Sequence, residues 1–219
     1  MWSSEVTNMI ITGIWETLYM TLVSTLVGYV IGLPMGIILT VSDKDGIKPN
    51  AVLYKILDVI ANIVRSVPFI ILLVLLIPFT RLVVGKSYGS TATIVPLVIA
   101  AAPYIARMVE SSLKEVDAGV IEAARSMGAS NFTIITKVML VEARTSLLVG
   151  ATITLGTILG YSAMSGAVGG GGLGAIAIRY GYTRWQTDIM IVTVVLLIIL
   201  FQIFQTVGMK LADKFDHRK

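Results

Sequence analysis

Long apolar stretches separated by short polar segments dominate this chain. Five of them, at residues of about 14–40, 56–79, 91–109, 146–166 and 187–210, are long enough to form membrane spans. An apolar helix needs roughly 20 residues to cross the hydrocarbon of a bilayer. The pattern therefore predicts an all-α membrane protein with five transmembrane helices, in which residues 1–219 form one transmembrane domain.

Two of the predicted helices should depart from a straight rod. The second contains Pro68 and Pro78, and the third contains Pro96 and Pro103. Proline removes a backbone donor and clashes with the preceding turn, so kinks are expected in both. The first stretch is longer than a bilayer requires, so its helix should tilt or project beyond the hydrocarbon.

Composition supports a membrane protein and excludes several other classes. The chain is 56% hydrophobic and only 14% charged, with a mean hydropathy of +0.87, whereas roughly 25% charge is usual in soluble domains. The net charge of +4 does not indicate nucleic-acid binding, because Lys and Arg cluster at the ends of apolar stretches without interleaved aromatic residues. No cysteine is present, which excludes disulfides and thiolate sites.

The basic residues instead indicate how the chain is oriented in the membrane. If the N-terminus lies outside, most Lys and Arg fall in cytoplasmic segments, and the outer side retains only Arg81, Lys86, Arg179 and Arg184. Because cytoplasmic loops carry an excess of basic residues, the asymmetry predicts an N-out, C-in topology. The segment of about 110–145, between the third and fourth spans, should then lie in the cytoplasm. The first apolar stretch is too long for a signal peptide and should remain in the mature protein.

Local signals in this cytoplasmic segment predict two short helices. Asp117 is a suitable N-cap for the first, and Gly128 can end it in the left-handed conformation. Ser130 can cap the second, which should run from Asn131 to about Glu142. The small residues Ala123, Ala124 and Gly128 would let another backbone approach closely. From these residues alone, an ordinary connection lying on the lipid headgroups is an equal alternative.

Glu122-Ala123-Ala124, followed by Gly128 and then Val138-Met139-Leu140, resembles the EAA loop of ABC-transporter permeases. The usual loop ends Ile-x-Leu-Pro, and here Val141 replaces the proline. The resemblance implies a coupling helix that docks in a groove of a nucleotide-binding subunit. The implied contact residues are Glu122, Ala123, Ala124 and Gly128.

A second resemblance covers nearly the whole chain. It rests on segments that include Trp15-Glu-Thr-Leu18, Asn62-Ile-Val-Arg-Ser-Val-Pro-Phe69, Ala102-Pro-Tyr-Ile-Ala-Arg-Met-Val-Glu110, Gly160-Tyr-Ser-Ala-Met164 and Gly166-Ala-Val-Gly169. These segments are similar to the permeases of methionine importers. The resemblance implies a type I ABC importer fold in the bacterial inner membrane and methionine transport by alternating access.

The same resemblance implies the partners. They are a second copy of the chain in a homodimer, two ABC ATPase subunits, a substrate-binding lipoprotein and membrane lipid. Two alternatives remain open from the sequence. One is an importer of another small amino acid, and the other is a membrane scaffold or enzyme without transport activity.

A glycine-rich run lies between the last two spans. Gly169, Gly171 and Gly174 match the dinucleotide pattern G-x-G-x-x-G, but they follow a membrane helix and not a strand. No P-loop sequence occurs, so no cofactor is expected in this chain, and ATP and Mg should be bound by the partner ATPase. The glycines are expected to form tight turns on the outer side, and residues 173–182 to form a short interfacial helix.

The candidate pathway residues are Tyr161, Ser162 and Met164, at the end of the fourth span, and Arg65 in the second. Met164 could close a pathway or simply fill the core. An unpaired charge at membrane depth costs several kcal/mol, so Arg65 is expected to have a structural partner or to attract a substrate carboxylate, and the structural role is preferred.

No catalytic or metal-binding constellation is evident. The charges Glu16, Asp58, Arg65, Glu110 and Asp188 are scattered over different helices. Glu16, Glu110 and Asp188 are expected to be solvated at the interfaces, as is the single histidine, His217. Glycine recurs at every fourth position in two of the spans, at Gly28, Gly32 and Gly36 and at Gly156 and Gly160. This spacing favours close packing of helices. We expect these contacts to lie within one subunit, and a contact between the two subunits of a dimer is the alternative.

Overall fold

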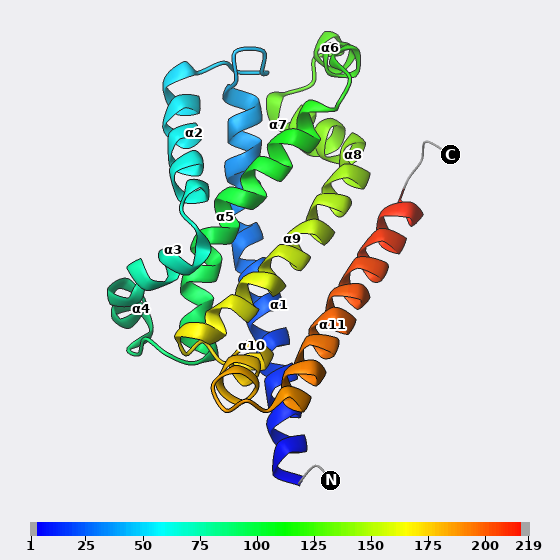
Figure 1. Ribbon diagram of the computed structural model, residues 1–219. Coiled ribbons are helices and arrows are strands. Elements are labelled where there is room, and N and C mark those ends of the chain that lie inside the picture. Colours follow the sequence, from blue (N-terminus) through cyan, green and yellow to red (C-terminus); the bar gives the residue numbers. More distant parts are fainter. Residues whose placement is uncertain (1–3, 216–219) are drawn as a thin grey trace.

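The computed structural model describes residues 4–215, and every regular element in that range is helical (Figure 1). The helices are α1 (Ser4–Ser42), α2 (Ala51–Ser66), α3 (Phe69–Leu75), α4 (Ile77–Val84), α5 (Ser90–Lys114), α6 (Ala118–Ser126), α7 (Asn131–Thr133), α8 (Leu140–Glu142), α9 (Arg144–Ser165), α10 (Gly172–Ile176) and α11 (Thr187–Lys214). Two π-helical segments, Ile134–Met139 and Ala177–Tyr182, and a 3-10 turn, Gly166–Val168, connect some of them. The all-α prediction is confirmed. His217 lies outside the described residues.

Within residues 4–215, four segments are long and apolar enough to cross a membrane: α1, α5, α11 and the segment Arg144–Tyr182, which consists of α9, the glycine-rich turn and α10 with the π-helical segment after it. The 39 residues of α1 span about 58 Å at a rise of 1.5 Å per residue. That length is roughly twice the hydrocarbon thickness, which agrees with the expected projection beyond the bilayer.

The second predicted span is broken. α2 and α3 meet at 101° and form a fifth span only if the bent pair crosses together. Val67, at the break, is extended with ψ of 125°, because the ring of a following proline disfavours the helical conformation. Pro78 lies in the first turn of α4, where a missing N–H costs nothing. The expectation of one kinked helix over 56–79 was therefore wrong: three helices occupy this stretch.

The prolines of the third span have a different effect. α5 continues through both Pro96 and Pro103 without interruption, and both side chains are buried. Proline thus interrupts the helix in the second span, where an extended residue precedes it, and does not interrupt α5.

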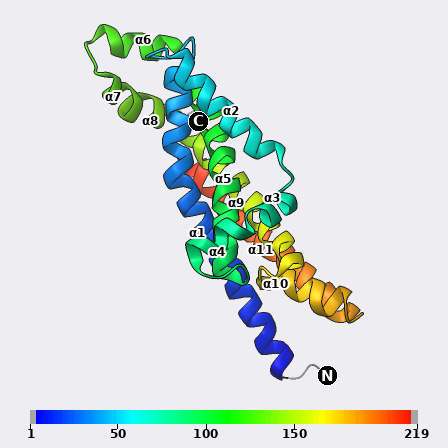
Figure 2. The same ribbon diagram turned by 90° about the vertical axis from the view of Figure 1, so that its left-hand side faces the viewer.

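The core is built on α1 packed along α5, two helices that lie side by side in both views (Figures 1 and 2). A Cβ at Gly28 would lie 2.9 Å from Ala101 Cβ, and one at Gly36 would lie 2.5 Å from the Ala106 oxygen. Glycine therefore permits the close approach, as the spacing of small residues predicts. Gly156 packs in the same way against Phe201 of α11, whereas a Cβ at Gly160 would meet nothing within 4 Å.

The two candidate functional regions lie at opposite ends of the helices. Figure 1 shows α6 at the top, near the end of α1 and the start of α2, and α10 at the bottom, near the start of α1. Figure 2 shows α6 and α10 separated in the same way. α11 begins at the α10 end and finishes toward the α6 end.

Candidate functional site

α6 forms because its two ends are capped as the sequence predicts. The Asp117 side chain accepts a hydrogen bond from Gly119 N at 2.7 Å. At the other end Gly128 has φ of +79°. Its N–H donates to the Arg125 oxygen, and Ala129 N donates to the Ala124 oxygen at 3.1 Å. These two bonds form a Schellman motif, which satisfies the last carbonyls of the helix.

The predicted contact residues on α6 do not all face outward. Glu122, Ala123 and Gly128 are exposed, but Ala124 is 5% exposed and packs against the protein's own core. The Ala124 side chain therefore faces the core of this subunit and not its surface, and a contact between Ala124 and a partner stays a prediction. The small side chain of Ala124 lets α6 lie close to the rest of the chain.

Two large apolar side chains beside α6 were missed by the sequence analysis. Met127 is 82% exposed and Phe132 is 75% exposed. Large apolar side chains at the surface indicate a contact with another molecule when they lie together. In a chain that is 56% hydrophobic, two further apolar residues carry no distinguishing signal, so only the small and charged positions of this segment stood out.

A cavity of about 770 Å³ separates α6 from the turn that follows α1. Glu122 and Arg125 of α6 line one side, and Asp43 and Ile47 line the other. Arg125 Nη2 donates to the Ile47 oxygen at 2.9 Å and bridges the two sides. α6 is thereby held to the turn that follows α1, and it also packs against the π-helical segment Ile134–Met139.

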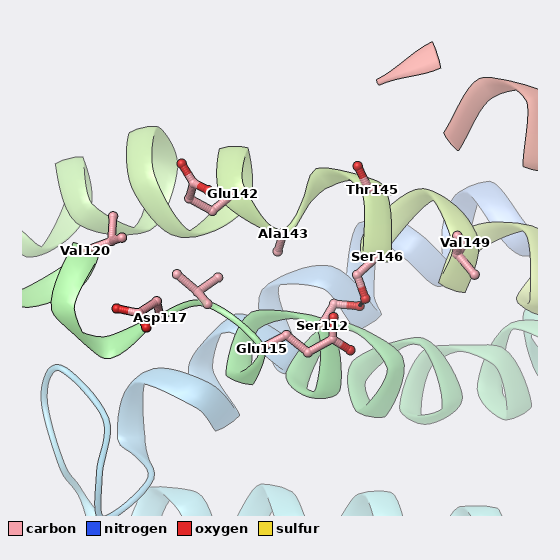
Figure 3. Close-up of a pocket in the computed structure, with 10 residues that line it drawn as sticks. Ser112, Glu115, Asp117, Val120, Glu142, Ala143, Thr145, Ser146 and Val149 are labelled. Atoms are coloured by element: carbon pink, nitrogen blue, oxygen red, sulfur yellow. Dashed lines mark hydrogen bonds between the residues drawn. The ribbon is translucent and has the colours of Figure 1, made fainter. Parts of the chain in front are cut away.

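A second cavity, of about 360 Å³, lies where the two ends of the segment of about 110–145 come together (Figure 3). Its lining includes the acids Glu115, Asp117 and Glu142. Figure 3 shows Ser146 of α9 pointing toward Ser112 of α5, and their hydroxyls are 2.9 Å apart. This hydrogen bond between α5 and α9 holds together the two ends of the segment that carries α6.

Asp58 and Glu110, two of the five charges that were expected to be scattered, belong to one cluster next to this segment. Arg107 of α5 donates to Glu110 Oε2 at 2.7 Å and to Asp58 of α2. Lys114 contacts Glu110 Oε1 at 2.8 Å and Asp43 Oδ2 at 2.7 Å. The expectation that Glu110 is solvated was wrong, since its side chain is only 7% exposed and is paired on both sides.

The hydrogen bond from Lys114 lowers the pKa of Asp43 below its ordinary value of 3.8. A carboxyl with a lowered pKa in the folded state adds stability above its ordinary pKa. That contribution is lost as the pH falls through the lowered value. The pair is therefore fully ionised at neutral pH.

Arg65 and Tyr161 line one small cavity of about 170 Å³ at the bend between α2 and α3. The Tyr161 ring stacks on Phe69 of α3, with centroids 4.5 Å apart and ring planes at 3°. The Arg65 side chain is exposed, and no hydrogen bond or ion pair joins it to any residue of 4–215. We expected Arg65 to pair with another side chain or a backbone carbonyl of this subunit, and residues 4–215 provide no such partner.

The other two pathway candidates differ in their surroundings. Ser162 is buried, and its hydroxyl donates to the Leu159 oxygen at 2.8 Å. Met164, in the last turn of α9, is 53% exposed. Of these two residues, only Met164 therefore has an exposed side chain beside the glycine-rich run.

The glycine-rich run is held by side chains from two other helices. Glu16 of α1 accepts from Gly172 N at 2.6 Å, and Thr17 accepts from Leu173 N at 2.9 Å. Thr93 of α5 donates to the Gly170 oxygen.

The expectation that Glu16 is solvated was wrong, because it caps the start of α10. Gly169, Gly171 and Gly172 have positive φ, as predicted for tight turns, and Leu173 to Tyr182 is helical.

Comparison with known proteins places the chain in a family. Residues 28–218 match the family described as binding-protein-dependent transport system inner membrane component. The chain is 49% identical over 217 residues to a Vibrio cholerae serotype O1 protein described as "Probable D-methionine transport system permease protein MetI", covering 99% of this chain and 96% of that one. It is 52% identical over 158 residues to the Escherichia coli K12 "D-methionine transport system permease protein MetI", covering 72% and 73% of the two chains.

Solved structures give the same result. A structure described as "Inward facing conformations of the MetNI methionine ABC transporter: CY5 SeMet soak crystal form" superposes with a TM-score of 0.96 at 50% identity, covering 99% of this chain and 100% of that one. A "Crystal structure of an amino acid ABC transporter with histidines" shares the fold, with a TM-score of 0.73 at 21% identity. The relatives are described as transport permeases and not as enzymes. The chain belongs to the family of inner membrane components of binding-protein-dependent transport systems.

Proposed function

We propose that this chain is the permease subunit of an ATP-driven methionine importer, which works as a homodimer by alternating access. The observation that carries the proposal is the match to the MetNI methionine transporter over 99% of the chain at 50% identity and a TM-score of 0.96. The Vibrio cholerae and Escherichia coli relatives are both described as D-methionine permeases. The proposed topology is N-out and C-in, based on the basic-residue asymmetry.

The proposed coupling surface is α6 with its flanking residues, and its partner is an ABC ATPase subunit. Support comes from the exposure of Glu122, Ala123 and Gly128, together with the apolar side chains of Met127 and Phe132. Because both ends of α6 are capped and Arg125 bonds the turn after α1, α6 can move as a rigid unit when a partner moves, and can pass that movement to the helices it contacts. Two ATPase subunits would dock on the homodimer and bind ATP and Mg.

The proposed pathway passes the end of α9, between the stacked pair at the bend and the glycine-rich run. Tyr161 and Ser162 would contribute to its wall, and Met164 would close it. Arg65 would attract the carboxylate of a passing amino acid, because it is exposed and unpaired within residues 4–215. A substrate-binding lipoprotein would deliver methionine on the glycine-rich side, and lipid would surround the remaining faces.

The test is transport by the complete complex in liposomes. The permease, its ATPase and its binding protein are reconstituted, and uptake of radiolabelled methionine is measured with and without internal ATP. We expect ATP-dependent methionine uptake, with little uptake of histidine or lysine. Uptake of histidine or lysine without uptake of methionine would disprove the substrate assignment and favour an importer of another amino acid. No ATP-dependent uptake of any amino acid would disprove the proposed importer.

A further inference from the structure

An ion cluster beside α6 joins three separate elements. It comprises Asp43 at the end of α1, Tyr54, Asp58 and Asn62 on α2, and Arg107, Glu110 and Lys114 on α5; we refer to it as the α2–α5 clasp. Glu110 lies at its centre, accepting from Arg107, from Lys114 and from the Tyr54 hydroxyl at 3.3 Å. Paired charges lose hydration, and apolar packing would often be at least as stabilising, so stability alone does not account for the cluster.

Arg107 is the residue that connects the two helices. One end of its guanidinium contacts Glu110 on its own helix, and Nη2 reaches both Asp58 and Asn62 on α2, the latter at 2.9 Å. Its side chain is 18% exposed. Arginine suits this position because its planar fork can hold two carboxylates in fixed directions.

α2 has little else to hold it against α5. Ala61 is its one fully buried residue. Leu57 and Val64 are half-buried, and Val64 packs against the core, but most of the other apolar side chains, such as Ile56 and Ile63, are exposed. Its orientation relative to α5 therefore depends on the clasp more than on apolar packing. A polar link of this kind holds two helices in one relative orientation, in addition to the few apolar contacts that Ala61 and Val64 make.

The clasp also lies between two regions of interest. On one side, Lys114 is the last residue of α5, and α6 follows within four residues. On the other side, α2 leads through the 101° bend to Phe69, which stacks on Tyr161 of α9. Movement of α6 would therefore reach the bend through α5, Arg107 and α2.

We propose that the clasp transmits the movement of α6 to α2 and so to the Phe69–Tyr161 contact, with Arg107 as the positioning residue. This inference rests on the proposed function, since it assumes that an ATPase moves α6. Loss of the link should separate ATP hydrolysis from transport, because α6 could still be moved while α2 no longer follows. A residue that only stabilised the fold would lower both activities together.

The test uses the complete complex in liposomes with its binding protein. Arg107→Ala and Asp58→Ala are compared with wild type for co-purification of the ATPase, for ATP hydrolysis and for methionine uptake per ATP. We expect normal co-purification and hydrolysis, with uptake per ATP reduced by about fivefold or more, the lower end of typical allosteric couplings. The double variant should lose no more than Arg107→Ala alone, because Arg107→Ala already removes every contact that Arg107 makes with α2.

Three further variants make the result specific. Asp58→Glu keeps the carboxylate and should restore uptake per ATP. Lys55→Ala removes an exposed charge from the same helix and should leave uptake per ATP unchanged. If Arg107→Ala does not fold, Asp58→Asn keeps the shape of the side chain, removes its charge and should give the same uncoupling.

Two results would overturn the inference while leaving the proposed function intact. One is unchanged uptake per ATP in the folded clasp variants. The other is a proportional loss of hydrolysis and uptake together with loss of the ATPase from the complex, which would make the clasp purely structural. Absence of ATP-dependent uptake by the wild-type complex would overturn the proposed function, and the inference with it.

Discussion

A Cβ atom at Gly32 of α1 would lie 2.5 Å from the backbone oxygen of Ala102 in α5. The obstructing atom belongs to the backbone, so it cannot move aside as the end of a flexible side chain could. The same relationship recurs one turn along the helix, between Gly36 and the Ala106 oxygen. α1 and α5 are therefore held close by the absence of side chains, and any substituent must push the helices apart.

Gly32→Ala should destabilise the protein, because even one methyl group overpacks this contact. Overpacking of a tight interior costs about 1–3 kcal/mol, which should lower the midpoint of thermal unfolding in detergent by several degrees. Gly160→Ala is the matched control, since a Cβ at Gly160 meets nothing within 4 Å. Equal unfolding midpoints for the two variants would show that the α1–α5 contact is not tight. Loss of the dimer in Gly160→Ala alone would assign that glycine to the subunit interface.

The proposed topology can be tested with single cysteines, because the chain contains none. Lys86, before α5, and Ser126, at the end of α6, are both exposed, and neither side chain takes part in an ion pair or hydrogen bond given for residues 4–215. In intact cells with a permeable outer membrane, a membrane-impermeant thiol reagent should label Lys86→Cys and not Ser126→Cys. Labelling of both after lysis is the control for accessibility. The opposite pattern in intact cells would reverse the orientation and place α6 outside, away from any ATPase.

Features that depend on neighbouring residues were predictable from the sequence. The caps of α6 and α7 are examples: Asp117 and Ser130 accept from backbone groups two and three residues later. The positive φ of Gly128 follows from the same local chemistry. The long spans were found because hydropathy over roughly 20 residues is also a local quantity.

Features that depend on distant residues were not predictable. Asp58 and Arg107 are 49 positions apart, and Glu16 meets Gly172 across 156 positions. No periodicity in the sequence connects such pairs, so Glu16 and Glu110 were expected to be solvated. A kink was expected in the second span, but the size of the 101° bend was not predictable for another reason. Proline marks where a helix is interrupted, but the new direction of the chain is set by packing of α3 against α5 and α9.

Gly128→Leu should abolish transport if α6 is the coupling surface. A left-handed backbone costs a residue with a side chain roughly 1–2 kcal/mol, and leucine would also add bulk beside the exposed face of α6. Gly85→Leu is the matched control, because Gly85 also has φ of +79° with nothing within 4 Å of a Cβ, but it ends α4 and lies away from α6. Both variants should insert in the membrane, and only Gly128→Leu should lose co-purification of the ATPase and methionine uptake. Similar uptake in both would remove Gly128 from the docking surface.

Met164→Ala should open the proposed pathway. The Met164 side chain is 53% exposed at the end of α9, so its truncation leaves no core cavity, and the fold should be unaffected. If the thioether closes the pathway in the resting state, its removal should permit methionine to leak from loaded liposomes without ATP and should raise basal ATP hydrolysis several-fold. Met209→Ala, an exposed methionine of α11, is the control for loss of a methionine in a membrane helix. Leak and basal hydrolysis equal to those of Met209→Ala would show that Met164 does not close the pathway, and would leave the Phe69–Tyr161 stack as the remaining candidate for that closure.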